Sequence, residues 1–375
     1  MGNNRDETLS AWKQYKSLSI NGTEKSLHGW RAQAQQQLQE GYGIHDIRQI
    51  LEFVVDWSNT KEWIPARTSG STGRPKNIKI KKDQIVESAL RTLSFLNLEK
   101  GDGALLCLPN KFIGGKMMIA RSIIGGLDLH IAEDFSRPDI PEGVDIAFAA
   151  LVPYQLHAIL KDDQLSEKWK RVKKIIVGGG HVDKALEAKL KDWPNDVYES
   201  FGMTETISHV ALRRISGEKV RQPFRALPGI RLEVDERNCL IIHSETLPTN
   251  PTITNDLIEL VDESAFHWLG RVDNLINSGG IKIIPEQVEK HLRPMINTRF
   301  FVAGIPDEQL GEKCVLIVEG QPYSDSDHAE LLNDFKEMLG KYEAPKEILY
   351  AEAFVETENG KINRKKTLKK VLKSA

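Results

Sequence analysis

The chain has 375 residues, of which 40% are hydrophobic and 28% charged, and its formal net charge is −2. This composition is typical of a soluble globular protein that has a large core and more than one domain. The charge balance gives no indication of nucleic-acid binding. No secretory signal is expected, because residues 1–16 lack an apolar run. No membrane insertion is expected either, because the most apolar stretch, residues 105–124, is interrupted by Lys111, Lys116 and Arg121.

The cysteines and histidines lack the spacing of a disulfide framework or a metal site. Cys107, Cys239 and Cys314 are far apart, and the ten histidines are scattered. This pattern indicates a reducing, cytoplasmic setting and no zinc site held by the protein.

Residues 80–200 alternate between helical and strand patterns. Helices are predicted over 82–98, 115–124, 153–162 and 183–192, and buried strands over 103–109, 127–132, 145–152, 173–177 and 196–200. Such alternation predicts an α/β fold with a mostly parallel sheet covered on both faces. Ligands of such sheets bind at the loops that leave the carboxyl ends of the strands.

The pattern changes after about residue 215. Short strands are predicted over 229–244 and 256–273, which form a small β-rich part at about 215–270. A separate α+β unit follows, with helices at 283–293 and 328–341 around a strand pair at 299–319. We therefore predict a large domain over 1–271 and a small one over 272–375. The tail 361–375 carries seven cations and no acid, which is typical of a solvated helix face or of an attraction for a polyanionic substrate.

The stretch TSGSTGRPK at 68–76 holds hydroxyls, glycines and a cation and almost no apolar surface. It differs from the Walker A spacing, yet it offers the same kinds of donors to a phosphate. By composition alone it is either a surface loop or a phosphate-binding loop. The residues that would contact a phosphate are Thr68, Ser69, Gly70, Ser71, Thr72, Gly73 and Lys76.

This stretch resembles the phosphate-binding signature of the adenylate-forming superfamily, which includes acyl-CoA synthetases, luciferases and adenylation domains. Further stretches resemble the family's other signatures in the family's order. These are GGG at 178–180, YESFGMTET at 198–206, TNDLIEL at 254–260, LGRVDNLINSGGIKIIPEQVE at 269–289 and ENGKINRKK at 358–366.

The resemblance implies ATP, Mg²⁺ and coenzyme A (CoA) as ligands. Thr204 would donate to the α-phosphate and Glu205 would hold Mg²⁺, and both would act in catalysis with Lys361. The other residues implied at the nucleotide are Gly178, Gly179, Gly180, Ser200, Phe201, Gly202, Met203, Asp256 and Arg271. Asn255 stands where the family has a glycine, and asparagine tolerates a left-handed backbone better than most residues.

The resemblance also implies a mobile small domain. Asp273 matches the hinge residue, about which the small domain would swing between the two half-reactions. The face around Gly279, Gly280 and Lys282 would then border the CoA site.

Among these enzymes, the sequence most resembles the o-succinylbenzoate–CoA ligase family of menaquinone biosynthesis. The segments ALVPYQLHAIL at 150–160 and FGMTETISHVALRR at 201–214 carry this likeness. The acid has a second carboxylate, which requires donors or a cation when it is buried. We expect it to meet Lys116, Tyr154, Ser208 and His209, with Lys111 and Arg121 as further candidates. Lys116 and Arg121 are five residues apart, so at most one should point inward.

The sequence departs from the family's pattern in two places, and three alternative functions remain open. Only 67 residues precede the loop, so the first subdomain is shortened, and the family's P-L-F-H segment reads PNKF at 109–112. The alternatives are a CoA ligase for another aryl or fatty acid, a stand-alone amino-acid adenylation enzyme, and a non-catalytic nucleotide-binding module. Relatives often form homodimers, but the sequence shows no interface.

Overall fold

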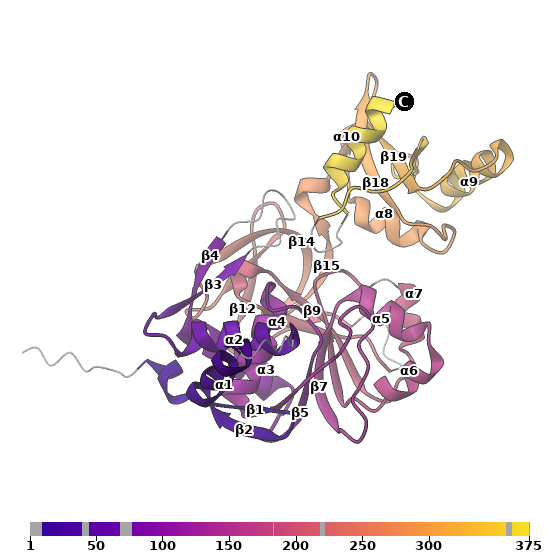
Figure 1. Cartoon of the computed structure of the whole chain (residues 1–375). Coiled ribbons are helices and arrows are strands. Elements are labelled where there is room, and N and C mark those ends of the chain that lie inside the picture. The colour runs from indigo at the N-terminus through magenta and orange to yellow at the C-terminus, as the bar shows by residue number, and fades with distance from the viewer. Residues whose placement is uncertain are drawn as a thin grey trace, which may run out of the picture. The chain divides into compact units, whose positions relative to one another are not determined.

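A computed structural model describes residues 10–39, 45–67, 77–182, 184–217, 222–357 and 362–374. The described residues group into two compact units (Figure 1). The first comprises residues up to 231 together with 243–252, and the second comprises 232–242 and 253 onward.

The first unit is built on a sheet with the strand order β11-β10-β9-β8-β7-β5-β6-β1-β2. The six strands from β9 to β1 are mutually parallel, whereas β10, β11 and β2 pair in antiparallel fashion at the two ends. A separate antiparallel pair is formed by β3 and β4. The strands are β1 (Ser17–Ile20), β2 (Thr23–Ser26), β3 (Trp63–Arg67), β4 (Asn77–Lys81), β5 (Gly103–Leu106), β6 (Asp128–Ile131), β7 (Ile146–Leu151), β8 (Lys174–Val177), β9 (Asp196–Gly202), β10 (His209–Arg214) and β11 (Phe224–Ala226).

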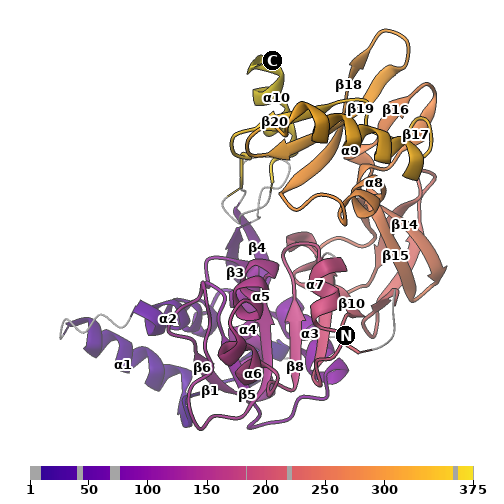
Figure 2. The same cartoon turned by 90° about the vertical axis from the view of Figure 1, so that its right-hand side faces the viewer.

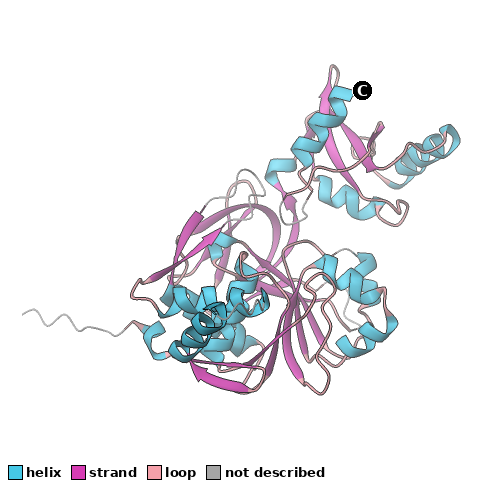
Figure 3. Ribbon diagram, in the orientation of Figure 1, coloured by secondary structure: helices cyan, strands magenta, loops and turns pink. Residues whose placement is uncertain are grey.

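Helices lie on both sides of this sheet, as Figure 3 shows. One core cluster packs the side chains of β5, β7, β8 and β9 against α5, α6 and α7, with Trp169 and Leu186 fully buried. Helices α3 and α4 pack against each other and α4 contacts β5. The helices are η1 (Ala11–Gln14), α1 (Leu27–Gln39), α2 (His45–Ser58), α3 (Lys82–Phe95), α4 (Ile113–Gly125), α5 (Pro153–Leu160), α6 (Asp163–Trp169), α7 (Lys184–Lys189) and η2 (Thr204–Thr206).

The second unit contains a run of four adjacent strands, β12 (Arg231–Val234), β13 (Cys239–His243), β14 (Thr252–Asp262) and β15 (Ala265–Arg271). It also contains a five-stranded sheet of β16 (Ile276–Ser278), β17 (Ile281–Ile283), β18 (Phe300–Asp307), β19 (Gly311–Glu319) and β20 (Ile348–Ala351). Its helices are η3 (Val272–Asn274), α8 (Pro285–Leu292), α9 (Asp325–Met338) and α10 (Arg364–Ser374), and Figure 2 shows α8 to α10 beside this sheet.

The five-stranded sheet is covered on both faces, because alternate residues of one strand point to opposite sides. Phe300 and Val302 of β18 pack with α8 and α9, whereas Phe301 between them packs with Val371 of α10. The opposite face of α10 carries exposed lysines, namely Lys365, Lys366, Lys369, Lys370 and Lys373. The basic tail is therefore an amphipathic helix with a solvated cationic face.

The predicted α/β fold is confirmed, and each helix and strand expected after residue 80 is present. The sequence analysis did not predict η1, β1, β2, α1, α2, β3 and β4 in the first part of the chain, nor α6, β10 and β11 later in it. The domain boundary proposed between Arg271 and Val272 stays a prediction. Within the described ranges, no helix is long and apolar enough to cross a membrane.

Each of the three cysteines is fully buried and unpaired. Cys107 follows β5, Cys239 begins β13 and Cys314 lies within β19. They belong to separate parts of the core, as the wide spacing in the sequence indicated.

Candidate functional site

The segment that follows β9 is a strained turn at the carboxyl edge of the parallel strands. β9 ends at Gly202, and the short helix η2 then buries Thr204 and exposes Glu205. Ile207 adopts φ 70° and ψ −53°, and the Ser208 amide donates to the Thr206 carbonyl at 2.8 Å. This geometry is that of a γ-turn, which is rare for a β-branched residue and costs about 1–3 kcal/mol. Strain of this kind concentrates at ligand-binding segments, so the turn marks the segment as a candidate site.

Gly202 permits the close approach of β9 and β10 at this edge. A Cβ atom at Gly202 would lie 2.4 Å from the Ser208 carbonyl oxygen and 2.5 Å from the His209 Cα, both of which are backbone atoms.

We therefore expect Gly202→Ala to lower the free energy of unfolding by about 1–3 kcal/mol, because the backbone must shift to admit the methyl group. Chemical denaturation would measure this change. Gly29→Ala is a control in the same unit, since a Cβ there meets only side-chain atoms at 3.3 Å or more. Because Gly29 lies in helix α1, where alanine is favoured over glycine, its substitution should leave the free energy of unfolding unchanged or raise it by up to about 1 kcal/mol. Equal effects of the two substitutions would contradict the clash.

The loop after β8 carries the three glycines and packs on β9. Gly179 has φ 78°, which favours glycine, and a Cβ at Gly178 would lie 2.6 Å from Ser200 Oγ. Cβ atoms at Gly179 and Gly180 would approach Val152 and Pro153. The segment that precedes Tyr154 therefore lies beside the glycine loop.

Buried Glu199 of β9 joins this loop to the strand. One carboxylate oxygen accepts from the Val182 amide at 2.8 Å and lies 3.0 Å from His181 Nδ1. The other accepts from Arg213 of β10, whose Nε and Nη2 lie 2.9 and 2.5 Å away. Burial raises the pKa of Glu199, but the His181 and Arg213 charges and these hydrogen bonds outweigh it and lower the pKa overall. Glu199 is therefore held ionised.

A second buried cluster lies where α3 and α4 meet the start of β10. Arg121 of α4 is 2% exposed, and its Nη2 donates to Ser208 Oγ at 2.8 Å. Burial lowers the pKa of this guanidinium to about 9, so it remains charged at neutral pH. Its Nε has no hydrogen-bond partner, and the described residues supply no carboxylate that pairs with it. An uncompensated buried charge of this kind favours an anionic ligand.

Hydrogen bonding fixes the tautomer of His209 in this cluster. The Thr92 hydroxyl donates to the Ser88 carbonyl at 3.2 Å, so it accepts from His209 Nε2 at 3.0 Å. His209 Nδ1 then accepts from the Ser208 hydroxyl, at 3.3 Å. Burial and the nearby Arg121 charge lower the pKa of His209 well below its usual range, so the ring is neutral. Arg121 is therefore the only charge in this chain of hydrogen bonds.

The expectation that at most one of Lys116 and Arg121 points inward is wrong, since both are buried. They occupy different sides of α4, as their five-residue spacing requires. Burial lowers the pKa of Lys116, and the negative charges of Asp56 and Glu52 in α2 oppose this shift only in part. Arg121, rather than Lys116, is the cation that contacts Ser208.

Tyr154 is the second residue of α5 and is 71% exposed. It lies on the segment beside the glycine loop, and the hydrogen-bond chain from Arg121 to Ser88 does not include it. Its role toward the acid stays a prediction, as does that of Lys116.

In the second unit, Asp256, Arg271 and Asp273 form one cluster. Asp256 accepts from Trp268 Nε1 at 3.0 Å and from Arg271 Nη1 at 3.3 Å, and burial raises its pKa. Arg271 Nη2 donates to Asp273 at 2.9 Å. The cluster brings together the two residues expected at the ribose and the residue expected at the hinge.

Asn255 does not adopt the left-handed backbone that the missing glycine suggested. It lies within β14, and its Nδ2 donates to the Asp273 carboxylate at 3.2 Å. The asparagine side chain therefore supplies a donor to the cluster at this position.

The residues expected at CoA lie in and around the β16–β17 turn. Gly279 and Gly280 have φ 60° and 81°, and a Cβ at Gly279 would lie 2.9 Å from the Tyr342 ring. Lys282 of β17 is exposed. The phosphate loop at 68–76 and Lys361 lie outside the described residues.

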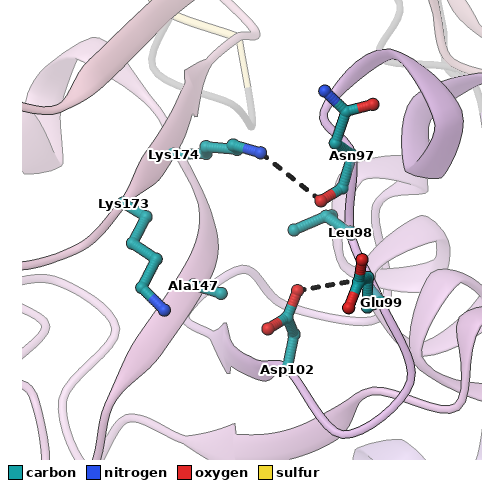
Figure 4. Close-up of a pocket in the computed structure, with 7 residues that line it drawn as sticks. All are labelled: Asn97, Leu98, Glu99, Asp102, Ala147, Lys173 and Lys174. Atoms are coloured by element: carbon teal, nitrogen blue, oxygen red, sulfur yellow. Dashed lines mark hydrogen bonds between the residues drawn. The ribbon is translucent and has the colours of Figure 1, made fainter.

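A polar pocket lies at the opposite edge of the first unit's sheet, where β5 and β8 begin. Figure 4 shows Lys174 directed at Asn97, and the Glu99 amide donating to Asp102 at 2.9 Å. Lys173, also in the lining, pairs with Asp145 at 3.1 Å. Because parallel strands carry ligand-binding loops at their carboxyl ends, we do not assign the candidate site to this pocket.

Comparison with known proteins identifies the family. The sequence profile of the family described as "AMP-binding enzyme" matches residues 67–240. A solved acyl-CoA synthetase (AMP-forming)/AMP-acid ligase II-like protein from Dyadobacter fermentans is 36% identical, with 87% of this chain and 94% of that chain covered and a TM-score of 0.59. The chain belongs to the AMP-binding enzymes. It is an AMP-forming acid–thiol ligase.

Other AMP-binding enzymes bear on the fold and the acid. A 2-succinylbenzoate–CoA ligase from Listeria monocytogenes is 25% identical over 336 residues, which are 84% of this chain and 71% of that protein. The O-succinylbenzoate coenzyme A synthetase of Bacillus subtilis was solved in complex with ATP and magnesium ion. It matches with a TM-score of 0.67 at 20% identity, and the match covers 81% of this chain and 69% of that chain. The second likeness supports the fold.

The metal requirements of an AMP-binding enzyme fit the donor set of this chain. The described residues contain no group of three or more His, Cys, Asp or Glu side chains that could hold a metal. Mg²⁺ is usually bound through one or two carboxylates together with substrate phosphates and water, so a single exposed carboxylate such as Glu205 fits this requirement, and its role as the metal ligand stays a prediction.

The sequence analysis missed two groups in this AMP-binding enzyme. Glu199 was not selected, although it lies directly opposite Arg213 in the β9–β10 register. Thr92 was not selected either, because α3 gives no motif. The β9–β10 hairpin register would have revealed the first pair, whereas no sequence signal identifies Thr92.

Proposed function

We propose that this AMP-forming ligase joins 2-succinylbenzoate to CoA through an acyl-adenylate. The observation that carries the substrate is the buried Arg121 guanidinium, which donates to Ser208 and has an unpartnered Nε. A dicarboxylic acid would supply the anion that this charge favours. A benzoic or fatty acid bound through its reacting carboxylate alone would leave Arg121 uncompensated.

The nucleotide is proposed to bind at the carboxyl edge of the parallel strands. The loop Gly178–Gly180 would receive the adenine, Asp256 and Arg271 the ribose, and the 68–76 stretch the phosphates. Bound Mg²⁺ supplies charge neutralisation on the phosphate oxygens. Thr204 would donate to the α-phosphate, and Lys361 would stabilise its developing charge.

The first half-reaction needs alignment more than covalent help from the protein. The acid carboxylate attacks the α-phosphate of ATP, and pyrophosphate leaves. The neutral His209 keeps Ser208 oriented as an acceptor for Arg121, so Arg121 and Ser208 would hold the second carboxylate while the first one reacts. In the second half-reaction the CoA thiol attacks the adenylate and AMP leaves. Asp273 is proposed as the hinge, and Gly279, Gly280 and Lys282 as the border of the CoA site.

The test is the formation of AMP and acyl-CoA by the purified chain. The acids compared are 2-succinylbenzoate, benzoate, a medium-chain fatty acid and mixed amino acids. We expect turnover with 2-succinylbenzoate at a kcat/KM at least about tenfold above that for each other acid, because benzoate and the fatty acid offer no second carboxylate to Arg121 and no amino acid has the same spacing between its carboxylates and the aromatic ring. Preference for benzoate or the fatty acid would retain the ligase chemistry and overturn the substrate. Preference for an amino acid would favour an adenylation enzyme.

A further inference from the structure

The strongest unassigned feature of the candidate site is the carboxylate of Glu199. It is 2% exposed, lies in the middle of β9, and has no role in either half-reaction. Its four donor atoms come from two separate segments, the loop after β8 and strand β10. Arg213, which supplies two of them, also donates to Glu187 of helix α7.

The connections of Glu199 join both ends of the proposed nucleotide site. On one side, the Val182 amide and the His181 ring are held at 2.8 and 3.0 Å, directly after the glycine loop. On the other side, Glu199 precedes Ser200, against which Gly178 packs, and lies in the strand that delivers Thr204. A shift of the loop relative to β9 would therefore change the spacing between the base and the α-phosphate.

Arg213 of β10 donates to the carboxylate oxygen of Glu199 that the loop does not use. Its guanidinium is shared between Glu199 and Glu187, with Nη1 3.1 Å from Glu187, and it lies 5.6 Å from the centre of the Phe224 ring. Arg213 balances the negative charge of Glu199 and occupies one of its carboxylate oxygens. The other oxygen is therefore left to accept from both donors of the loop.

We propose that Glu199 is a positioning residue, which fixes the Gly178–Val182 loop on β9 and so sets the spacing between the base and phosphate sites. The inference rests on the proposed nucleotide site. It does not depend on the identity of the acid. A residue that served stability alone would change the unfolding midpoint, whereas a positioning residue also changes the affinity of the folded enzyme for ATP.

The experiment measures Mg-ATP binding by titration calorimetry on the full chain, and the KM for ATP and for the acid. Glu199→Gln keeps the size of the side chain and an acceptor for the Val182 amide but removes the charge. We expect its dissociation constant and KM for ATP to rise at least about tenfold. The KM for the acid should stay within about twofold, since the Arg121 cluster is unchanged.

Glu187→Gln is the matched control, because it also removes a carboxylate from Arg213 but makes no contact with the loop in the pairs described. We expect ATP binding as in the wild type. His181→Ala is the second test variant, since its ring is 59% exposed and its loss should not impair folding. It should weaken ATP binding by about two- to fivefold, because Glu199 loses one of its two donors in the loop.

Wild-type ATP affinity in folded Glu199→Gln would overturn the proposal. If Glu199→Gln does not fold, unchanged ATP affinity in His181→Ala would overturn it. A wild-type chain that does not bind Mg-ATP would overturn this proposal together with the proposed function. A chain that binds ATP but does not use 2-succinylbenzoate would overturn only the substrate, and the effect of Glu199→Gln on ATP would still be expected.

Discussion

Arg121→Met is expected to lower kcat/KM for 2-succinylbenzoate by about 100-fold, because it removes a buried charged donor from the second carboxylate. Methionine keeps much of the volume and flexibility of the side chain, so the packing of α4 is retained. The measurement compares 2-succinylbenzoate with 4-oxo-4-phenylbutanoate, which lacks only the ring carboxylate. For that second acid, kcat/KM should stay within about threefold of the wild-type value.

The free energy of unfolding provides a second readout for Arg121→Met. Because Arg121 has no described carboxylate partner, its replacement by an apolar residue should leave the stability unchanged or raise it. An equal loss of activity with both acids would assign Arg121 to the alignment of the Ile207 turn through Ser208, and would contradict its role at the carboxylate. Lys111→Met is the matched control on an exposed cation, and no change in acid preference is expected.

Lys361→Ala is expected to lower the rate of adenylate formation by about 100- to 1000-fold, because it removes the positive charge proposed at the α-phosphate in the transition state. The second half-reaction, measured as thioester formation from supplied acyl-adenylate and CoA, should remain within about threefold of the wild type. Pyrophosphate release and thioester formation are followed separately in the same preparation.

The basic tail supplies a control for Lys361. Lys366 and Lys369 are exposed on α10, so Lys366→Ala and Lys369→Ala remove the same charge from the same region. Both should leave each half-reaction unchanged. Equal impairment of both half-reactions by Lys361→Ala would contradict the proposal that Lys361 serves adenylation alone.

The order of helices and strands was predictable because buried parallel strands and their covering helices leave continuous apolar runs separated by turn residues. The position of Thr204 and Glu205 after a strand was predictable for the same reason. The strained backbone at Ile207 was not, since an isoleucine gives no local preference for positive φ and only the surrounding contacts impose it.

Side-chain burial was harder to predict than the elements. A cationic residue in a helix is usually solvated, so Lys116 and Arg121 were not both expected inside. Their burial depends on α2 and on β10, which approach α4 from different parts of the sequence. The function of Asn255 was likewise misjudged, because its partner Asp273 lies in a later segment.

The burial of all three cysteines has a consequence for an enzyme whose co-substrate is itself a thiol. Burial raises the pKa of Cys107, Cys239 and Cys314, for Cys314 to about 12. Thiol–disulfide exchange proceeds through the thiolate and requires access to the sulfur, so these side chains are protected from mixed-disulfide formation with oxidised CoA. In the folded chain, the sulfur that takes part in chemistry is that of the co-substrate.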